Sequence, residues 1–219
     1  MYNILIIGPQ GSGKGTQSRK ISERLAIPAI SSGNLLRAEV ERGTGLGGRI
    51  SSYIEKGDRV PSDVVDQVIA ARLAEDDTVR GVILDGYPRT VDQAERLQVI
   101  MGDLGRQITH VVYLDVPDSE VVKRLAGRRV CSNSHCAVNY HAEYNPPKGK
   151  PHVCDVCGGQ LVQRIDDHPE AIRHRLELFH RDTEPLVSYY RRQDILHEID
   201  GAGSIDEVGV AVSKALGIP

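Results

Sequence analysis

The chain has 219 residues, of which 40% are hydrophobic and 26% charged, with a formal net charge of −3 and a pI near 6.2. This composition predicts a globular protein with one domain or a core with insertions, and it argues against a large basic face for nucleic acid. No stretch approaches the roughly 18 apolar residues of a membrane span, and the apolar N-terminus has no basic region or cleavage site. We therefore expect a cytoplasmic protein that binds neither nucleic acid nor membranes.

The first motif follows the apolar run Tyr2–Ile7, which predicts a buried strand, and it reads GPQGSGKGT over residues 8–16. Three of its glycines permit backbone conformations closed to other residues and bring N–H groups close to a polyphosphate: Gly8, Gly11 and Gly13. A glycine-rich turn between a strand and a helix is typical of phosphate binding. The alternative is a structural turn with a chance lysine.

Lys14 favours the phosphate-binding interpretation. A helix beginning near this residue adds its positive dipole end, and the Lys14 amine adds a mobile cation for the β- and γ-phosphates. The fit to the P-loop pattern GxxxxGK[ST] has one departure, because Gly15 stands where Ser or Thr is expected and Thr16 follows one place later. The sequence predicts a P-loop with this single deviation.

Four further β-branched runs predict strands at Ala29–Ser31, Val79–Leu84, Ile108–Val116 and Ile195–Ile199. Helical patterns separate them, and three helices are expected to begin near Ser62, Asp118 and Pro169, with Gly127 closing the second. Their apolar stripes are core positions. Continuous apolar strands alternating with amphipathic helices predict an α/β fold, a P-loop three-layer α/β/α arrangement with a five-stranded parallel sheet. Ligands of such sheets sit at the carboxyl ends of the strands.

Two segments interrupt this alternation. Residues 31–61, here called the arm segment, lie between the second strand and its crossover, and the glycines of Gly43–Gly48 suggest a mobile piece. Residues 128–164, here called the cysteine segment, hold all four cysteines and a turn-rich stretch at Asn145–Pro151. We expect the cysteine segment to form a small inserted domain.

Asp85 ends the predicted buried strand in the run VILDGYPR at residues 82–89. A P-loop protein places at such a position the acid that orients Mg²⁺ and its waters. An acidic strand end without a role is the alternative. Lys14 and Asp85 together favour the metal-orienting role for Asp85.

The four cysteines are Cys131, Cys136, Cys154 and Cys157. CDVCGG at residues 154–159 resembles a zinc knuckle, because the two-residue spacing turns both thiolates toward one point. Cys131 and Cys136 would supply the second pair, with a looser spacing of four residues. We expect a structural Zn²⁺ site with these four ligands.

Other interpretations of the cysteines stay open. His135 could replace one ligand, or hydrogen bonds could hold a segment with free thiols. A redox C-x-x-C pair is disfavoured, because Cys154 does not open a helix after a strand, the context that lowers the pKa of a thiol. The metal would stabilise the segment and take no part in the chemistry.

Five motifs in order resemble the adenylate kinase family: GPQGSGKGT, ISSGNLLR at residues 30–37, LDGYPRT at 84–90, GRRV at 127–130 and the pair Asp166-Asp167. The match is to the long-lid form and spans essentially the whole chain. It implies ATP + AMP ⇌ 2 ADP on a three-part molecule. The parts are a core domain (1–30, 62–127 and 165–219), an AMP-binding arm (31–61) and a lid domain (128–164).

The resemblance also implies roles for individual residues. The ATP-binding residues are Gly11, Ser12, Gly13, Lys14, Gly15, Thr16, Arg124 and Arg128. The AMP-binding residues are Ser31, Arg37, Val60, Gly86, Arg89, Gln93, Arg164 and Arg175. The catalytic residues are Lys14, Arg89, Arg128, Arg164 and Arg175. Arg124 would pack on the donor adenine and Gln93 would read the AMP base by its paired donor and acceptor, whereas Asn34 stands where the family more often has aspartate.

Physical chemistry supports such a set of arginines. Transfer between two nucleotides brings many anionic oxygens together, and the planar guanidinium binds phosphate in bidentate fashion without losing its proton. An ionised AMP oxygen can attack directly, so we expect no nucleophilic side chain and no covalent phosphoenzyme. Asp166 and Asp167 are expected either to pair with lid arginines or to cap the helix that begins at Pro169.

Alternative functions remain at this stage. A related kinase could use another donor, such as GTP, or another acceptor, such as UMP. A P-loop switch would have a second partner surface and slow hydrolysis, and a zinc-ribbon nucleic-acid module would need more basic and aromatic residues than this segment carries. The expected cofactors are Mg²⁺ with ATP and a structural Zn²⁺, the expected partners are ATP, AMP and ADP, and we expect a monomer.

Overall fold

The computed structural model describes residues 1–56, 58–133, 136 and 138–218. Its main sheet consists of β1 (Tyr2–Ile7), β2 (Ala29–Ser31), β3 (Gly81–Asp85), β4 (His110–Asp115) and β8 (Leu196–Asp200). All pairings in it are parallel, in the order β2-β3-β1-β4-β8. This confirms the predicted five-stranded parallel sheet, with strand ends displaced by one or two residues. No helix of the described chain is long and apolar enough to cross a membrane.

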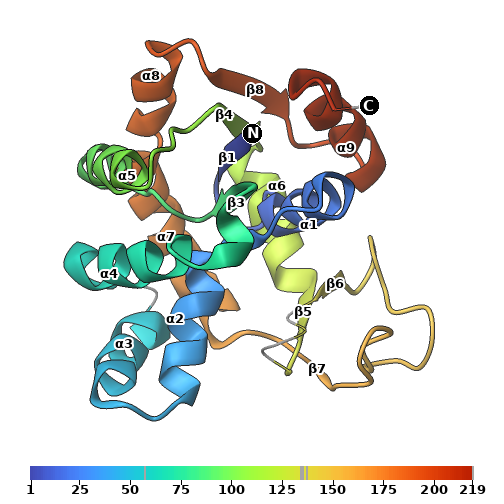
Figure 1. Cartoon of the computed structure of the whole chain (residues 1–219). Helices are drawn as coiled ribbons and strands as arrows, with labels where there is room; N and C mark the ends of the chain where they lie inside the picture. Colours follow the sequence, from blue (N-terminus) through green and yellow to red (C-terminus); the bar gives the residue numbers. More distant parts are fainter. Residues whose placement is uncertain (57, 134–135, 137, 219) are drawn as a thin grey trace.

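Helices cover both faces of this sheet (Figure 1). Alternate residues of β1 point to opposite faces, so Leu5 and Ile7 join one buried cluster while Ile4 and Ile6 join another. The second cluster lies against α1 (Lys14–Leu25) and α9 (Ile205–Ala215). The first lies against α4 (Ser62–Leu73), α5 (Val91–Asp103) and α8 (Pro185–Arg191). The strands are therefore buried on both sides, as their continuous apolar runs require.

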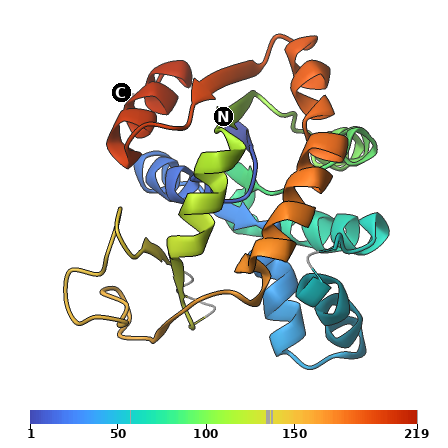
Figure 2. The same ribbon diagram turned by 180° about the vertical axis from the view of Figure 1, so that it is seen from behind.

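Two further helices pack on each other beside the ends of β1 and β4. These are α6 (Asp118–Gly127) and α7 (Pro169–Leu178), and Val121, Leu125, Ile172 and Leu176 form the contact between them. Figure 2 shows them side by side, next to the short strands of the cysteine segment. The helices predicted near Ser62, Asp118 and Pro169 begin at these residues, and α6 ends at Gly127 as predicted. Ser62, however, is the first residue of α4 rather than a side-chain cap, since Pro61 precedes it.

The arm segment is a pair of helices, α2 (Ser32–Glu41) and α3 (Gly45–Lys56). Three of the glycines that we expected to mark a mobile stretch lie in α3: Gly45, Gly47 and Gly48. A Cβ atom at Gly47 would collide with the carbonyl oxygen of Glu39. Glycine at this position therefore lets the backbones of α2 and α3 come close together.

The cysteine segment has its own small antiparallel sheet. Its strands are β5 (Arg128–Cys131), β6 (Asn139–His141) and β7 (Leu161–Val162), in the order β6-β5-β7. Three short helical turns complete the described fold: η1 (Asp76–Thr78), η2 (Ile165–Asp167) and the π-helical η3 (Phe179–Thr183). The turn η2 joins this segment to α7, so the chain leaves the core after α6 and returns to it at α7.

Candidate functional site

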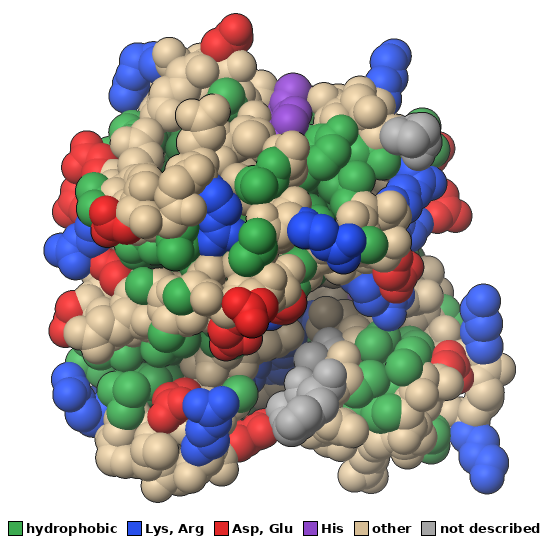
Figure 3. All heavy atoms as spheres, viewed as in Figure 1, with side chains coloured by type: hydrophobic (Ala, Val, Ile, Leu, Met, Phe, Trp, Pro, Cys, Tyr) green, Lys and Arg blue, Asp and Glu red, His purple; other side chains and the backbone are tan. Residues whose placement is uncertain are grey.

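A pocket of about 1380 Å³ opens at the carboxyl ends of the parallel strands. Residues from the core, the arm segment and the cysteine segment line it, and Figure 3 shows it as a hollow beside the cysteine segment. Every nucleotide-binding residue expected from the sequence lines this pocket. The strand ends thus bring together side chains that are up to about 160 positions apart in the sequence, as expected for a parallel sheet.

The loop between β1 and α1 has the backbone of an anion-binding nest. Gly8, Gly11 and Gly13 have φ values of 153°, 79° and 95°, a region that favours glycine. A Cβ at Gly8 would lie 2.7 Å from the carbonyl oxygen of Leu114, so the close packing also requires glycine there. The hydroxyl of Ser12 is buried without a hydrogen-bond partner among the described residues. The loop therefore presents unpaired donors at the N-terminus of α1.

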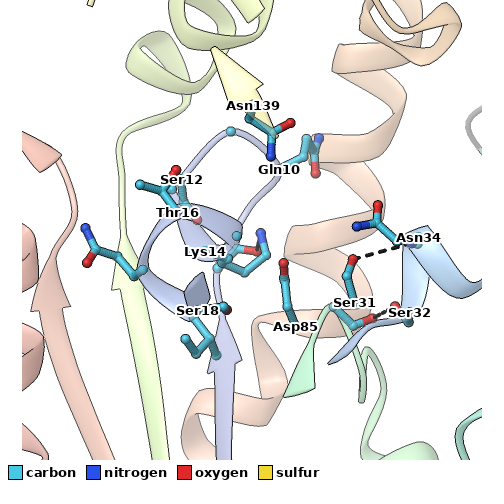
Figure 4. Close-up of a pocket in the computed structure, with 18 of the residues that line it drawn as sticks. Gln10, Ser12, Lys14, Thr16, Ser18, Ser31, Ser32, Asn34, Asp85 and Asn139 are labelled. Atoms are coloured by element: carbon cyan, nitrogen blue, oxygen red, sulfur yellow. Dashed lines mark hydrogen bonds between the residues drawn. The ribbon is translucent and has the colours of Figure 1, made fainter. Parts of the chain in front are cut away.

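Lys14 lies inside this loop, and its amine donates to the carbonyl oxygens of Gly8 at 2.8 Å and Pro9 at 2.7 Å. Burial at the base of the pocket lowers the pKa of Lys14 to about 8, while Asp85 opposes this effect. Figure 4 shows the Asp85 carboxylate facing Lys14 across the pocket. Gly15 leaves the space between α1 and Asp85 open, since a Cβ there would lie 3.4 Å from Asp85 Oδ2.

Arg37 and Arg89 face the pocket from the arm side. The amide oxygen of Asn34 accepts from Arg37 Nη2 at 2.6 Å, which gives Asn34 a role in orienting that guanidinium. Arg89 Nε donates to the carbonyl oxygen of Gly86 at 2.7 Å. Burial, followed by the neighbouring cations Arg59 and Arg175, lowers the pKa of Arg89 from its ordinary value. The two guanidiniums therefore lie in a field that favours an anionic ligand.

Two aspartates hold two more arginines at the opposite side. Arg128 Nε donates to Asp167 Oδ2 at 2.8 Å, and Arg128 Nη2 contacts Asp167 Oδ1. Arg175 Nη1 lies 2.8 Å from Asp166 Oδ2 and donates to the Asp166 carbonyl at 3.1 Å. The predicted pairing with a lid arginine is confirmed for Asp167, whereas Asp166 pairs with Arg175 of α7 instead. Capping is wrong, because His168 precedes α7 and no side chain caps it. The buried carboxylates fix the directions of both guanidiniums.

Arg164 contributes a cation without such a partner among the described residues. It precedes η2, and burial, followed by Arg37 and Arg128, lowers the pKa of its guanidinium. Keeping several like charges together without full pairing costs free energy, and an anionic ligand would offset that cost. This electrostatic arrangement indicates a site for several phosphate groups.

Arg124 lies on α6 at the other end of the pocket. Its guanidinium donates to Glu120 Oε1 at 2.9 Å, to the carbonyl of Gly201 at 2.9 Å and to that of Ala202 at 3.1 Å. The loop after β8 is therefore fastened to α6. Sequence reasoning missed residues 201–203 of this loop as pocket lining, because no motif marks them.

Gln93 is buried at the start of α5, with its amide fixed at both ends. Its Oε1 accepts from the Arg89 backbone N–H at 2.8 Å, and its Nε2 donates to Ser62 Oγ at 3.2 Å. Three more residues predicted for the AMP site line the same part of the pocket: Ser31, Val60 and Gly86. Ser31 also caps α2 by accepting from the Asn34 N–H.

Asn139 was not expected from the sequence. It comes from β6 of the cysteine segment and lies over the P-loop next to Gln10 (Figure 4). Its Oδ1 is buried without a hydrogen-bond partner among the described residues. A polar side chain from an inserted segment carries no recognisable spacing, so only the fold reveals this placement.

The four cysteines come together at one point. Their sulfur atoms all lie within 4.8 Å of one another, with Cys131 and Cys157 at 3.3 Å and Cys136 and Cys154 at 3.7 Å. Tetrahedral Zn²⁺ with Zn–S bonds of about 2.3 Å needs sulfur separations of about 3.8 Å, so the donor set and its size fit this metal. The suggested alternative ligand His135 lies outside the described residues.

A family model described as adenylate kinase matches residues 6–195. The chain belongs to the adenylate kinase family. It is 47% identical over 214 residues to the adenylate kinase of Methanosarcina barkeri, with 98% of each chain covered. It is 45% identical to that of Archaeoglobus fulgidus over 214 residues, 98% of this chain and 97% of the relative. It is also 45% identical over 213 residues to the adenylate kinase of Streptomyces griseus, with 97% of this chain and 96% of the relative covered.

Membership of this family makes the chain a phosphotransferase that uses a phosphate group as acceptor and converts ATP and AMP into two ADP. Kinases of this family generally use Mg²⁺. The P-loop, the cationic pocket and the parallel sheet agree with this assignment.

Proposed function

We propose that the chain transfers the terminal phosphoryl group of ATP to AMP by direct in-line displacement in the pocket described above. The observation that carries this proposal is the gathering of one amine and five guanidiniums around the P-loop: Lys14, Arg37, Arg89, Arg128, Arg164 and Arg175. Two nucleotides bound tail to tail carry enough negative charge to need such a set.

The donor side consists of the P-loop and α6. The backbone N–H groups of residues 11–16, with Ser12 and Thr16, would hold the ATP phosphates, and Lys14 would release its loop carbonyls to reach them. Arg128 would meet the phosphates from the cysteine segment. The hydrogen bonds of Arg124 lie in the plane of its guanidinium, so its face can pack on the donor base. Mg²⁺, held through its waters by Asp85, would neutralise charge on the ATP phosphates.

The acceptor side consists of the arm segment and the loop after β3. Arg37 and Arg89 would bind the AMP phosphate, and Ser31, Val60 and Gly86 would line the pocket of its nucleoside. Since Gln93 Oε1 accepts from the Arg89 N–H and one Nε2 hydrogen is donated to Ser62 Oγ, the amide would offer the base its second N–H as a donor, rather than the expected pair of donor and acceptor. Adenine presents an acceptor at N1, whereas guanine presents an N–H there, and this favours AMP.

The transfer itself needs no general base. An AMP phosphate oxygen is ionised at neutral pH and attacks the γ-phosphorus as the bond to the β-phosphate bridging oxygen breaks. Arg89, Arg164 and Arg175 would stabilise the charge that spreads over the transferred group, together with Arg128 and Lys14. One phosphoanhydride forms as one breaks, so the reaction runs readily in both directions.

We further infer the division of labour among the three parts of the chain. The core (1–30, 62–127 and 165–219) would carry the P-loop, the arm segment would bind AMP, and the cysteine segment would close over ATP as a lid. Closure of both would exclude water, the competing acceptor. The contribution of Asn139 and Arg128 from the cysteine segment to the pocket supports this division.

The four cysteines would hold a structural Zn²⁺ with a closed coordination shell. A Cβ at Gly159 would lie 2.9 Å from Cys131 Sγ, so the glycine leaves room for the cluster. Such a cluster suits a reducing compartment, which supports a cytoplasmic location. We also expect a monomer, which light scattering during gel filtration would test.

The function is tested by incubating the protein with Mg²⁺, ATP and each nucleoside monophosphate in turn and following diphosphate formation. We expect ADP from AMP, with GMP and UMP at least about a hundredfold slower, because guanine N1 and uracil N3 each present an N–H to the Gln93 donor. Turnover of another monophosphate but not AMP would overturn the acceptor assignment. Slow ATP hydrolysis with no acceptor dependence would instead indicate a switch.

The lowered pKa of Lys14 predicts a pH dependence. Protonated Lys14 binds phosphate, and in the free enzyme its proton is lost as the pH rises through about 8. We therefore expect kcat/KM for ATP to fall above pH 8, approaching tenfold per pH unit, while kcat at saturating ATP declines later because bound phosphates retain the proton. Lys14→Arg should abolish the decline between pH 8 and 9.5. A constant kcat/KM for ATP up to pH 10 would contradict the assignment.

A further inference from the structure

Arg59, at the end of the arm segment, makes an unusual number of contacts for a residue outside every recognised motif. Its side chain is 21% exposed. Nη1 donates to the Arg89 carbonyl oxygen at 3.2 Å, and Nη2 donates to the Leu178 carbonyl oxygen at 2.8 Å and to Thr183 Oγ1 at 3.0 Å. Nε lies 3.2 Å from Asp182 Oδ2. One guanidinium therefore joins three separate segments.

These contacts suit the chemistry of each partner. Leu178 is the last residue of α7, at the point where the helix widens into a π-helical turn, and its carbonyl oxygen accepts from Arg59 there. The π-helical turn η3 follows and supplies Thr183 and Asp182 one after the other. Thr183 Oγ1 also donates to the Arg89 carbonyl at 3.0 Å. Arg59 and Thr183 thus hold the same carbonyl from two directions.

The three joined segments carry the residues assigned above to AMP. Val60 follows Arg59 directly, Arg89 is held through its own carbonyl, and Arg175 lies on α7 one turn before Leu178. We propose that Arg59 is a positioning residue for the AMP subsite, which fixes the Arg89 backbone relative to Val60 and α7. The inference rests on the proposed roles of these residues.

Arg59 also affects the site electrostatically. After burial, the charge of Arg59 is the largest cause of the lowered pKa of the Arg89 guanidinium. The positive charge of Arg59 is partly offset by Asp182, which pairs with the exposed Arg181 as well, at 2.7 Å and 2.9 Å. Arg181 is therefore a matched control, because it shares the carboxylate but none of the described contacts with Arg89 or α7.

The test compares the steady-state kinetics of three variants with those of the wild type. Arg59→Leu should raise KM for AMP about tenfold or more, the effect of losing hydrogen bonds from a charged donor, and leave KM for ATP within about twofold. Arg59→Lys keeps the charge but loses the planar set of guanidinium donors. Its KM for AMP should therefore lie between those of the wild type and Arg59→Leu. Arg181→Leu should change neither KM by more than about twofold.

Thr183→Val provides a second measurement should Arg59→Leu fail to fold. It removes the hydroxyl between Arg59 and the Arg89 carbonyl, and it should raise KM for AMP about threefold to tenfold. An unchanged KM for AMP in folded Arg59→Leu or Thr183→Val, an equal rise for both nucleotides, or the same effect from Arg181→Leu would overturn the inference. A wild type without AMP-dependent turnover would contradict the proposed function instead.

Discussion

Lys14→Met should lower kcat/KM of the forward reaction about a thousandfold. The amine lies inside the P-loop, and methionine keeps its length and apolar stem while removing the charge. Removal of one preorganised group that stabilises the charge of a transition state typically costs 10²- to 10³-fold, and here ground-state binding of the phosphates is lost too. The measurement is ADP formation at varied ATP with saturating AMP.

Lys123→Met is the control for this variant, since Lys123 is exposed on α6 and lies outside the pocket lining. It should retain the wild-type rate within about twofold. The far-UV circular dichroism of Lys14→Met should match the wild type, because the Lys14 side chain hydrogen-bonds to two loop carbonyls and to no helix or strand. A loss smaller than about tenfold in a folded Lys14→Met protein would remove Lys14 from the mechanism.

The second large effect concerns the cysteine cluster. We expect about one Zn²⁺ per chain in the purified protein, and Cys154→Ser combined with Cys157→Ser should abolish it. The buried cluster of the cysteine segment is small, consisting of Cys131, Tyr140, Cys154 and Leu161, so we expect the segment to depend strongly on the metal. Structural zinc contributes roughly 10–16 kcal/mol of binding free energy. In the double variant this free energy no longer stabilises the folded segment.

The variant should therefore lose most of its activity, by a hundredfold or more, and show an early unfolding transition in thermal denaturation. Mass spectrometry would measure the zinc content, calorimetry would measure the unfolding transition, and ADP formation would measure the activity. Ser132→Ala is the control, since it changes an exposed side chain beside Cys131 and keeps every sulfur. A wild type without metal that is equally stable would contradict the zinc proposal.

The sequence predicted the sheet and the P-loop because both depend on local patterns. Buried parallel strands read as short apolar runs, and an anion nest requires glycine at particular positions, here Gly8, Gly11 and Gly13. The placement of the predicted nucleotide-binding residues then followed from the parallel topology. Their individual roles stay predictions.

Features that depend on distant partners could not be predicted. Arg59 bonds to backbone atoms of Arg89 and Leu178, and every residue type offers the same carbonyl, so no sequence signal marks the contact. Asn34 differs in having a local partner, three residues along α2. It stands where aspartate is commoner, yet its amide oxygen still accepts from Arg37. The choice between pairing and capping for Asp166 and Asp167 also required the positions of Arg128 and Arg175.

The tight fit of α2 on α3 has a mechanical consequence. With no side chain at Gly47 to act as a spacer, the backbone of one helix rests on the Glu39 peptide of the other, and sliding between them would open a void or force a clash. We therefore expect any movement of the pair to be that of one rigid unit about its two chain connections. One connection leads into β2, and the other is the stretch that Arg59 fastens to α7.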